Sequence, residues 1–168
     1  MKNLQVKILF LFISLCIISC NRTTKVERKN EPTIYKTQSD DSEMKAARKK
    51  ASETLSQFFK AFESKNSQFN SFSIKQTFSN KDYNEHIWLN NIFKKNHEYY
   101  GVVDNLPEYV KDVDLGDTVK IENEKVSDWM YLENSQLKGG YTIRVLRYRM
   151  TEDERKKFDA ESGMVIKE

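Results

Sequence analysis

One long amphipathic segment constrains this chain more than any other feature of its sequence. Its apolar residues recur at spacings of three and four, and they are Met44, Ala47, Ala51, Leu55, Phe58, Phe59 and Phe62. This period predicts a helix over residues 43–64 with lysines on its opposite side. Asp40 or Asp41 can cap its first turn. A helix that is apolar on one side must bury that side, so the fold needs a second layer.

A sheet is the second layer that the sequence predicts. Apolar residues alternate with polar ones from Phe72 to Phe78, which is typical of a half-buried strand. Four further strands are expected over residues 86–93, 98–103, 118–121 and 126–133. Polar turns are short throughout, so we expect a three-strand meander followed by a hairpin of the last two strands. The fold class is therefore α+β, with about five antiparallel strands covered by the long N-terminal helix.

The C-terminal part is predicted to form short helices. Gly139 and Gly140 end the last strand, and Thr142 can cap a helix over residues 141–149. The same residues also fit a strand, and we favour the helix. Thr151 and Glu154 form a capping box for a final helix to about residue 160. Residues 163–168 are expected to be a frayed tail.

The first 41 residues predict export and a tether. Lys2 and Lys7 precede an apolar run over residues 8–18, which is too short for a transmembrane helix and typical of a secretory signal. Its end at Cys20 resembles a bacterial lipoprotein signal, with plain cleavage and secretion as the alternative. We therefore expect a signal peptide over 1–20, a lipid on Cys20, a flexible tether over 21–41 and one α+β domain over 42–162.

Charge and cysteine content exclude several classes of protein. Of the 28 lysines and arginines, Lys2 and Lys7 lie in the leader, which leaves 26 against 25 acids. A nearly neutral domain gives no reason to expect nucleic acid as a partner. Cys16 and Cys20 are the only cysteines and both lie in the leader, so thiol chemistry, disulfides and thiolate zinc sites are excluded from the domain.

Three residues are candidates for catalysis. Glu85 and His86 could serve acid–base chemistry, and Asp128 could complete a pair of carboxylates with Glu85. Neighbours on a strand face opposite sides, however, so Glu85 and His86 should not touch. A structural role is the better reading of all three. His86 and His97 match no metal-binding spacing, and we expect no metal and no cofactor.

An aromatic and basic stretch suggests a binding surface. The residues with the composition of a protein-binding hot spot are Trp88, Trp129, Tyr131, Tyr141, Arg144 and Arg147. They could equally be core aromatics with arginine side chains lying over them. We favour one exposed patch, because a small two-layer core has little room for so many large rings.

Several short motifs occur in an order that resembles a known family. They lie at residues 85–89 (Glu-His-Ile-Trp-Leu), 101–107 (Gly-Val-Val-Asp-Asn-Leu-Pro), 116–119 (Gly-Asp-Thr-Val), 128–131 (Asp-Trp-Met-Tyr) and 139–144 (Gly-Gly-Tyr-Thr-Ile-Arg). In these motifs residues 44–158 are similar to the YegJ-like bacterial proteins, which carry a DUF2314-type domain. The domain has no established function, so the resemblance implies no role for any residue.

These observations predict a membrane-anchored lipoprotein of the cell envelope, facing the periplasm or the outside. We expect its domain to bind an unknown envelope protein or other macromolecule, for example as an immunity or protective protein. The alternatives are an envelope hydrolase using Glu85, His86 or Asp128, and a purely structural envelope protein.

Overall fold

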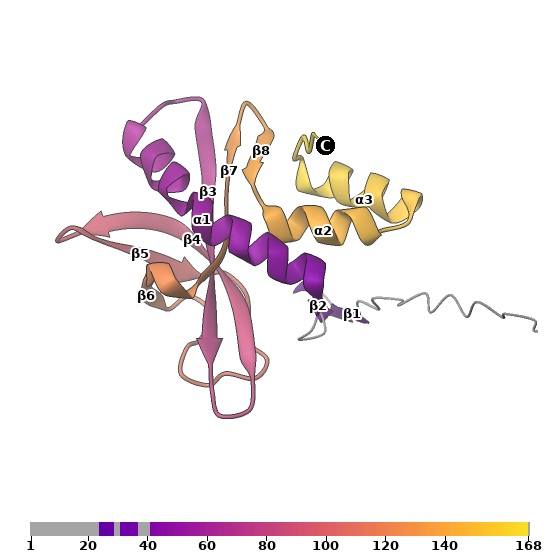
Figure 1. Ribbon diagram of the computed structural model, residues 1–168, viewed down its shortest axis with the longest axis horizontal. Helices are drawn as coiled ribbons and strands as arrows, with labels where there is room; N and C mark the ends of the chain where they lie inside the picture. Colours follow the sequence, from indigo (N-terminus) through magenta and orange to yellow (C-terminus); the bar gives the residue numbers. More distant parts are fainter. Residues whose placement is uncertain (1–23, 29–30, 37–40, 168) are drawn as a thin grey trace, which may run out of the picture.

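The computed structural model describes residues 24–28, 31–36 and 41–167, and Figure 1 shows the arrangement of their elements. The helices are α1 (Ser42–Ser64), η1 (Asn123–Lys125), α2 (Tyr141–Arg149) and α3 (Glu152–Ser162). The strands are β1 (Thr24–Arg28), β2 (Glu31–Lys36), β3 (Phe69–Ser79), β4 (Asn84–Lys95), β5 (Glu98–Val103), β6 (Thr118–Lys120), β7 (Val126–Glu133) and β8 (Gln136–Gly139). The α+β prediction is confirmed: one antiparallel sheet, a long N-terminal helix and short C-terminal helices.

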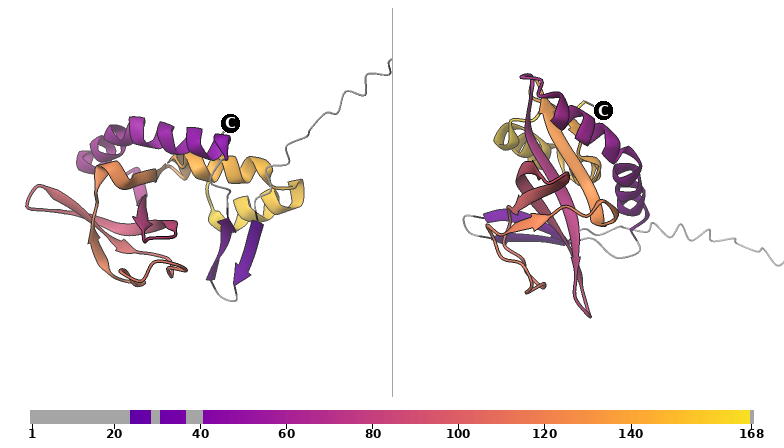
Figure 2. Two further views of the ribbon diagram at one scale, coloured as in Figure 1. Left: turned by 60° about the horizontal axis from the view of Figure 1, so that its bottom comes forward. Right: turned by 90° about the vertical axis from the view of Figure 1, so that its left-hand side faces the viewer.

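The amphipathic helix α1 covers one face of the sheet, as its sequence predicts (Figure 2). Asp41 caps its start by accepting a hydrogen bond of 3.0 Å from the backbone amide of Met44. Phe58 is fully buried and stacks against Phe62, while Trp129 of β7 lies 6.1 Å from Phe58 between ring centroids. The core between α1 and the sheet therefore combines these aromatic rings with aliphatic side chains of the strands, such as Ile74, Ile87 and Leu89.

The sheet has six strands in the order β6-β5-β4-β3-β7-β8. The predicted hairpin of residues 118–121 and 126–133 is wrong, because β6 pairs with β5 and β7 pairs with β3. The one-turn helix η1 redirects the chain between them, and β7 places Trp129 opposite Ile74 in the core. The sixth strand, β8, follows a turn at Asn134 and Ser135, whose positive φ angles suit a two-residue hairpin.

Register divides the side chains of the sheet between two faces. On the face under α1, Ile74 lies opposite both Leu89 and Trp129. One residue further along β3, Lys75 lies opposite Trp88 and Asp128 and faces the other side. The second face of the sheet therefore carries charged and polar residues at its centre.

The ambiguous segment 141–149 is the helix α2, as favoured from the sequence. Its N-terminal amides are bound by Asp128, and Thr142 is not the cap. A side chain on Gly139 would lie 2.2 Å from the carbonyl oxygen of Trp129, so this turn requires glycine.

The capping box of Thr151 and Glu154 begins α3, which confirms the final predicted helix. The tail that follows is docked, and the expectation of fraying is wrong. Val165 donates a backbone hydrogen bond of 2.8 Å to Ser135 and accepts one of 3.0 Å from Leu137. A short parallel bridge to Gln136 thus holds Val165 beside β8.

Within the predicted tether, β1 and β2 pair as an antiparallel hairpin in which Val26 lies opposite Ile34. Val26 and Ile34 are β-branched residues at facing positions, which favour a strand pair over the flexible tether that the polar composition predicts. The leader and Cys20 lie outside the described residues. Among the described residues, no helix combines the length and apolar character needed to cross a membrane.

Candidate functional site

Glu85 holds the loop that follows β5. Its carboxylate accepts hydrogen bonds from the backbone amides of Glu108 at 2.7 Å, Tyr109 at 3.0 Å and Val110 at 3.2 Å. Oxygens that already accept three hydrogen bonds have little capacity left to take a proton from a substrate. Glu85 is thus an anchor for the loop.

His86 lies on the opposite face of β4, as the alternation of a strand requires. Its Nδ1 is 3.0 Å from the hydroxyl of Thr77 on the neighbouring strand. Burial lowers the pKa of His86 to about 3, and the nearby cations Arg48 and Lys75 act in the same direction. The imidazole is therefore neutral near pH 7, and it is a far weaker base than a catalytic histidine needs to be.

Asp128 is fully buried and caps α2. Its Oδ1 accepts from the amides of Trp129 (2.8 Å) and Tyr141 (3.1 Å). Its Oδ2 accepts from the amide and the hydroxyl of Thr142, at 2.8 and 2.6 Å. Burial raises the pKa of Asp128, while Lys75 and the donated hydrogen bonds oppose that effect.

Lys75 completes this buried group from the neighbouring strand. Its ammonium donates to the hydroxyl of Thr142 at 3.2 Å and lies 4.7 Å from the centre of the Trp88 ring. Burial lowers the pKa of Lys75, and the charge of Asp128 acts against that. The arrangement fixes the start of α2 against the sheet and leaves Asp128 closed to a substrate.

The three catalytic candidates consequently do not meet at one site. No hydrogen bond or ion pair among the described residues joins Glu85, His86 and Asp128 to one another. Two shallow depressions of about 430 and 410 Å³ lie beside Asn123, and none of the three residues lines either of them. Within the described part of the chain, no cluster of three metal-ligating side chains occurs.

The two candidate arginines hold the C-terminal segment in place. Arg144 donates to the backbone carbonyls of Gly139 (3.0 Å), Leu137 (2.9 Å) and Lys167 (2.7 Å). Arg147 makes a bidentate pair with Asp159 of α3, at 2.8 and 2.7 Å. Both guanidinium groups therefore make structural contacts within the domain.

The candidate aromatics do not form the predicted exposed patch. Trp129 is 2 % exposed and donates to the carbonyl of Ala51, and Tyr131 stacks on Phe72 with centroids 5.1 Å apart. Tyr141 packs edge-on against Trp129 at 5.7 Å. Trp88 lies on the other face of the sheet, beneath Lys75. The alternative interpretation, core aromatics with arginines beside them, describes most of this group.

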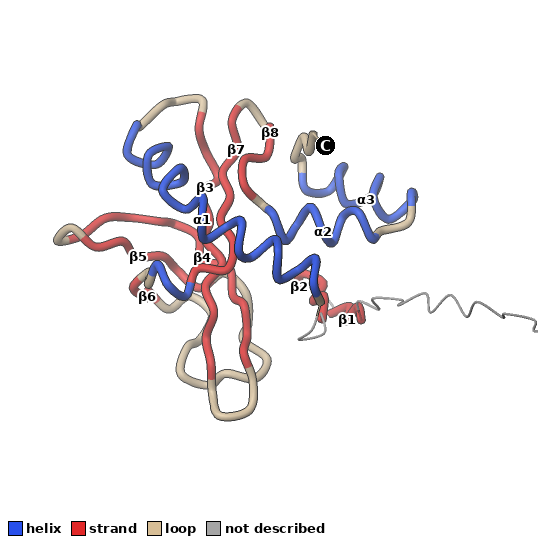
Figure 3. The backbone as a smooth tube through the Cα atoms, in the orientation of Figure 1, coloured by secondary structure: helices blue, strands red, loops and turns tan. Residues whose placement is uncertain are grey.

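A different group of apolar side chains reaches solvent, where the turn between β3 and β4 (residues 80–83) meets the loop over residues 104–117. We call these two segments the tyrosine end, and Figure 3 shows them together at one end of the molecule. Tyr83 is 53 % exposed and stacks on Tyr109 with centroids 4.6 Å apart. Leu106 and Leu115, on the loop, are 43 % and 56 % exposed.

The tyrosine end is held by hydrogen bonds at several points besides Glu85. Asn80 donates to the carbonyl of Tyr109 at 3.0 Å and accepts from the amides of Asp82 and Tyr83 at 2.9 and 2.8 Å. Asn105 accepts from the amide of Trp88 at 2.9 Å. These hydrogen bonds hold in place the backbone of the two segments that carry Tyr83 and Tyr109.

Comparison with known proteins identifies the family. The model of an uncharacterized bacterial protein family, DUF2314, matches residues 41–166, so the chain belongs to this family. The uncharacterized protein YegJ of Escherichia coli (strain K12) is 33% identical over 104 residues, covering 62% of this chain and 67% of that protein.

A second relative, from Neisseria meningitidis serogroup B, has a name that refers to ankyrin repeats. It is 38% identical over 80 residues, which are 48% of this chain and 32% of that protein. This chain therefore corresponds to about a third of that longer relative. No solved structure matches the chain.

Proposed function

We propose that this chain is a lipid-anchored protein of the cell envelope whose domain binds another macromolecule through the tyrosine end. The observation that carries the proposal is the Tyr83–Tyr109 stack, in which Tyr83 is exposed and Tyr109 half-buried, held in place by Glu85 and Asn80. Large apolar side chains are costly to expose, and aromatic anchors dominate protein interfaces. An ordered loop also loses little conformational entropy on binding.

The contacts of the catalytic candidates favour binding over catalysis. Asp128 is enclosed by four donors, and Glu85 accepts three backbone hydrogen bonds. The alternative hydrolase would need Glu85, His86 or Asp128 to act on a substrate, and burial lowers the pKa of His86 far below the range of a catalytic base. We therefore propose a binding module, one form of which is an immunity or protective protein that occupies an incoming toxin or enzyme.

The envelope anchor rests on the leader and on Cys20. The test is fractionation of cells that produce the chain with and without Cys20→Ser. The wild type should be in the membrane fraction and the variant in the soluble fraction. A Cys20→Ser chain that stays with the membranes would refute attachment through Cys20.

The binding proposal is tested by photocrosslinking in cells. A photoreactive residue is placed in the full chain at position 106, within the tyrosine end. The matched control is position 53 on α1. Glu53 is exposed there, and its carboxylate lies 3.8 Å from the ammonium of Lys49 in a surface ion pair. Discrete adducts from position 106 and none from position 53 are expected. The absence of adducts from position 106 would argue against a binding surface there.

A further inference from the structure

The tyrosine end is strongly acidic. Its two segments contain only two lysines, Lys81 and Lys111, against six carboxylates: Asp82, Asp104, Glu108, Asp112, Asp114 and Asp117. The whole chain has a formal net charge of +3, so this charge is local. An acidic field of this kind attracts cations and repels phosphate groups.

Much of this negative charge is not compensated within the domain. Asp82, Asp112 and Asp114 are exposed, and among the described residues no ion pair is recorded for any of them. Elsewhere on the surface, by contrast, Glu98 pairs with Lys120 and Glu122 pairs with Lys125. Asp82, Asp112 and Asp114 are therefore available to a partner, whereas Asp104 and Asp117 accept hydrogen bonds within the domain.

The apolar and the acidic side chains occupy the same short segments. Tyr83 follows Asp82 directly, and Leu115 follows Asp114. Protein interfaces commonly combine an apolar centre with aromatic anchors and a charged rim. The rim raises the rate of association with a partner of opposite charge and disfavours partners of like charge.

We infer that the tyrosine end binds a basic, partly apolar segment of a partner protein. Aliphatic side chains of that segment cover the stacked Tyr83 and Tyr109, and its lysines or arginines face the exposed carboxylates. The inference rests on the proposed function and specifies the chemistry of the partner. Anionic lipid surfaces and nucleic acids do not fit this surface, because their phosphates meet like charge.

The test uses the chain from residue 21 onwards, which contains every element that the structure describes. The probe is a short synthetic peptide of alternating leucine and lysine, compared with a leucine–glutamate peptide and with oligolysine. Calorimetric titration should show saturable binding of the leucine–lysine peptide, weaker at high salt. The leucine–glutamate peptide should not bind, and oligolysine should bind more weakly because it lacks apolar side chains.

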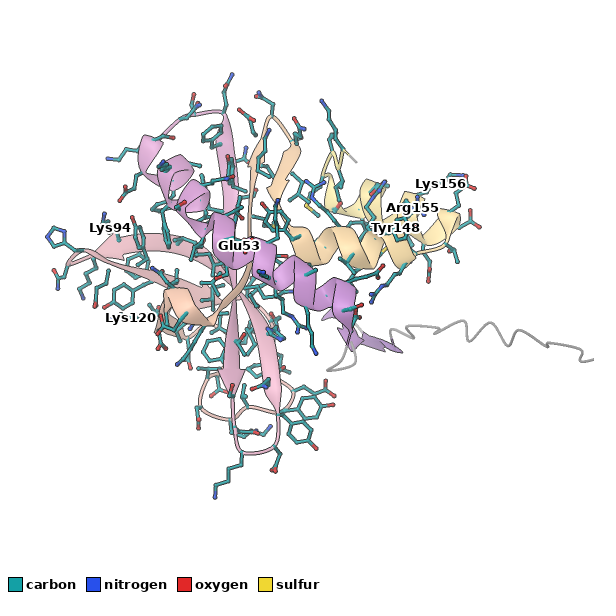
Figure 4. The ribbon with its side chains drawn as sticks, viewed as in Figure 1. Glu53, Lys94, Lys120, Tyr148, Arg155 and Lys156 are labelled. Carbon is teal, nitrogen blue, oxygen red and sulfur yellow. The ribbon has the colours of Figure 1, made fainter. Side chains whose placement is uncertain are left out.

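Two double variants and two matched controls locate the site. Tyr83→Ser with Leu106→Ser should lower the affinity at least about tenfold, as loss of an aromatic anchor does. Asp112→Lys with Asp114→Lys should lower it similarly and reduce its salt dependence. Tyr148→Ser, at a tyrosine that is 76 % exposed on α2, and Glu53→Lys on α1 should leave it unchanged. Both control positions lie away from the tyrosine end in Figure 4.

Several results would overturn the inference. They are no binding of the leucine–lysine peptide, equal binding of the leucine–glutamate peptide, or full affinity in the Tyr83→Ser/Leu106→Ser variant. If position 106 still crosslinks a macromolecule in cells, the binding function stands and only the basic partner is wrong. If position 106 crosslinks nothing, the proposed function fails as well. Adducts between two copies of the chain would assign the surface to self-association.

Discussion

Two carboxylates in this molecule make nearly the same contacts and serve different ends. Asp128 and Glu85 each accept hydrogen bonds from three backbone amides. Asp128 is fully buried and joins α2 to the sheet beside Lys75. Glu85 is only half-buried, and the loop that it orders presents Leu106 and Leu115 to solvent and carries Tyr109, on which the exposed Tyr83 of the β3–β4 turn stacks. The difference indicates that one anchor supports the fold and the other supports a surface.

The largest loss of stability should follow removal of the buried anchor. Asp128→Ala leaves amide groups of α2 and the ammonium of Lys75 without their buried acceptor or counter-charge. The expected loss is about 3–5 kcal/mol in the free energy of unfolding. Urea denaturation measures it, with Asp128→Asn as the milder variant. A loss below about 1 kcal/mol would contradict the role of Asp128 as a buried anchor.

A third carboxylate, Asp41, tests the same idea through pH. Its hydrogen bonds to Arg149, at 2.6 and 2.8 Å, lower the pKa of Asp41 to about 2. A carboxyl group whose pKa is lowered by folding stabilises the fold at pH values above its pKa in the unfolded chain, 3.8. This stabilisation is lost as the pH falls from 3.8 towards 2. Asp41→Asn should therefore cost about 2 kcal/mol at pH 7. At pH 2 the variant and the wild type should unfold at similar urea concentrations.

Glu85→Gln should have a smaller and more local effect than Asp128→Ala. The amide side chain keeps one acceptor oxygen, so the expected loss is about 1–2 kcal/mol. Hydrogen exchange should become faster at the amides of residues 108–110 and stay unchanged at Tyr141 and Thr142. Equal acceleration at both places would show that the two anchors are not independent.

His86 should affect stability only as pH falls. Its pKa is lowered to about 3 in the folded protein. As the pH falls, His86 is therefore protonated in the unfolded chain before it is protonated in the folded one. The neutral imidazole therefore contributes its full share to the free energy of unfolding above pH 6.5, its ordinary pKa. That contribution is lost as the pH falls from 6.5 towards 3. His86→Gln should flatten the decline between these values. A variant with the same decline as the wild type would exclude His86 as its source.

The smallest effect on stability is expected at the tyrosine end itself. Tyr83 is 53 % exposed, so Tyr83→Ser should change the free energy of unfolding by no more than about 0.5 kcal/mol. The melting temperature checks this, with Tyr148→Ser as the matched control. A large fall in the melting temperature would mean that the Tyr83–Tyr109 stack stabilises the fold. The tyrosine end would then have a structural role like that of Asp128.

Local patterns explain which parts of the structure could be predicted from sequence. The apolar period of α1, the alternation in β3 and the capping box of Thr151 each act within a few residues. The pairing of β7 with β3 could not be derived in this way, because it depends on which strand offers Trp129 a place in the core. A choice between distant partners leaves no local signal.

The same limit applies to the candidate site. Asp128 binds amides 13 and 14 residues further along, and Glu85 binds amides 23 to 25 residues away. These separations along the sequence do not correspond to any motif spacing. The sequence alone therefore left both residues as candidates for catalysis. The sequence does carry one indication of the tyrosine end. Tyr83 lies in a polar turn, where a large aromatic ring is unusual.

The most direct test measures photocrosslinking from position 106 in the wild type and in Glu85→Gln, with both chains folded and equally abundant. Glu85 does not have to touch a partner for this test, because its role is to order the loop that does. We expect a clear fall in adduct yield in Glu85→Gln, together with faster hydrogen exchange at the amides of residues 108–110. An unchanged yield from a chain whose loop amides exchange freely would contradict the claim that an ordered tyrosine end is the binding surface.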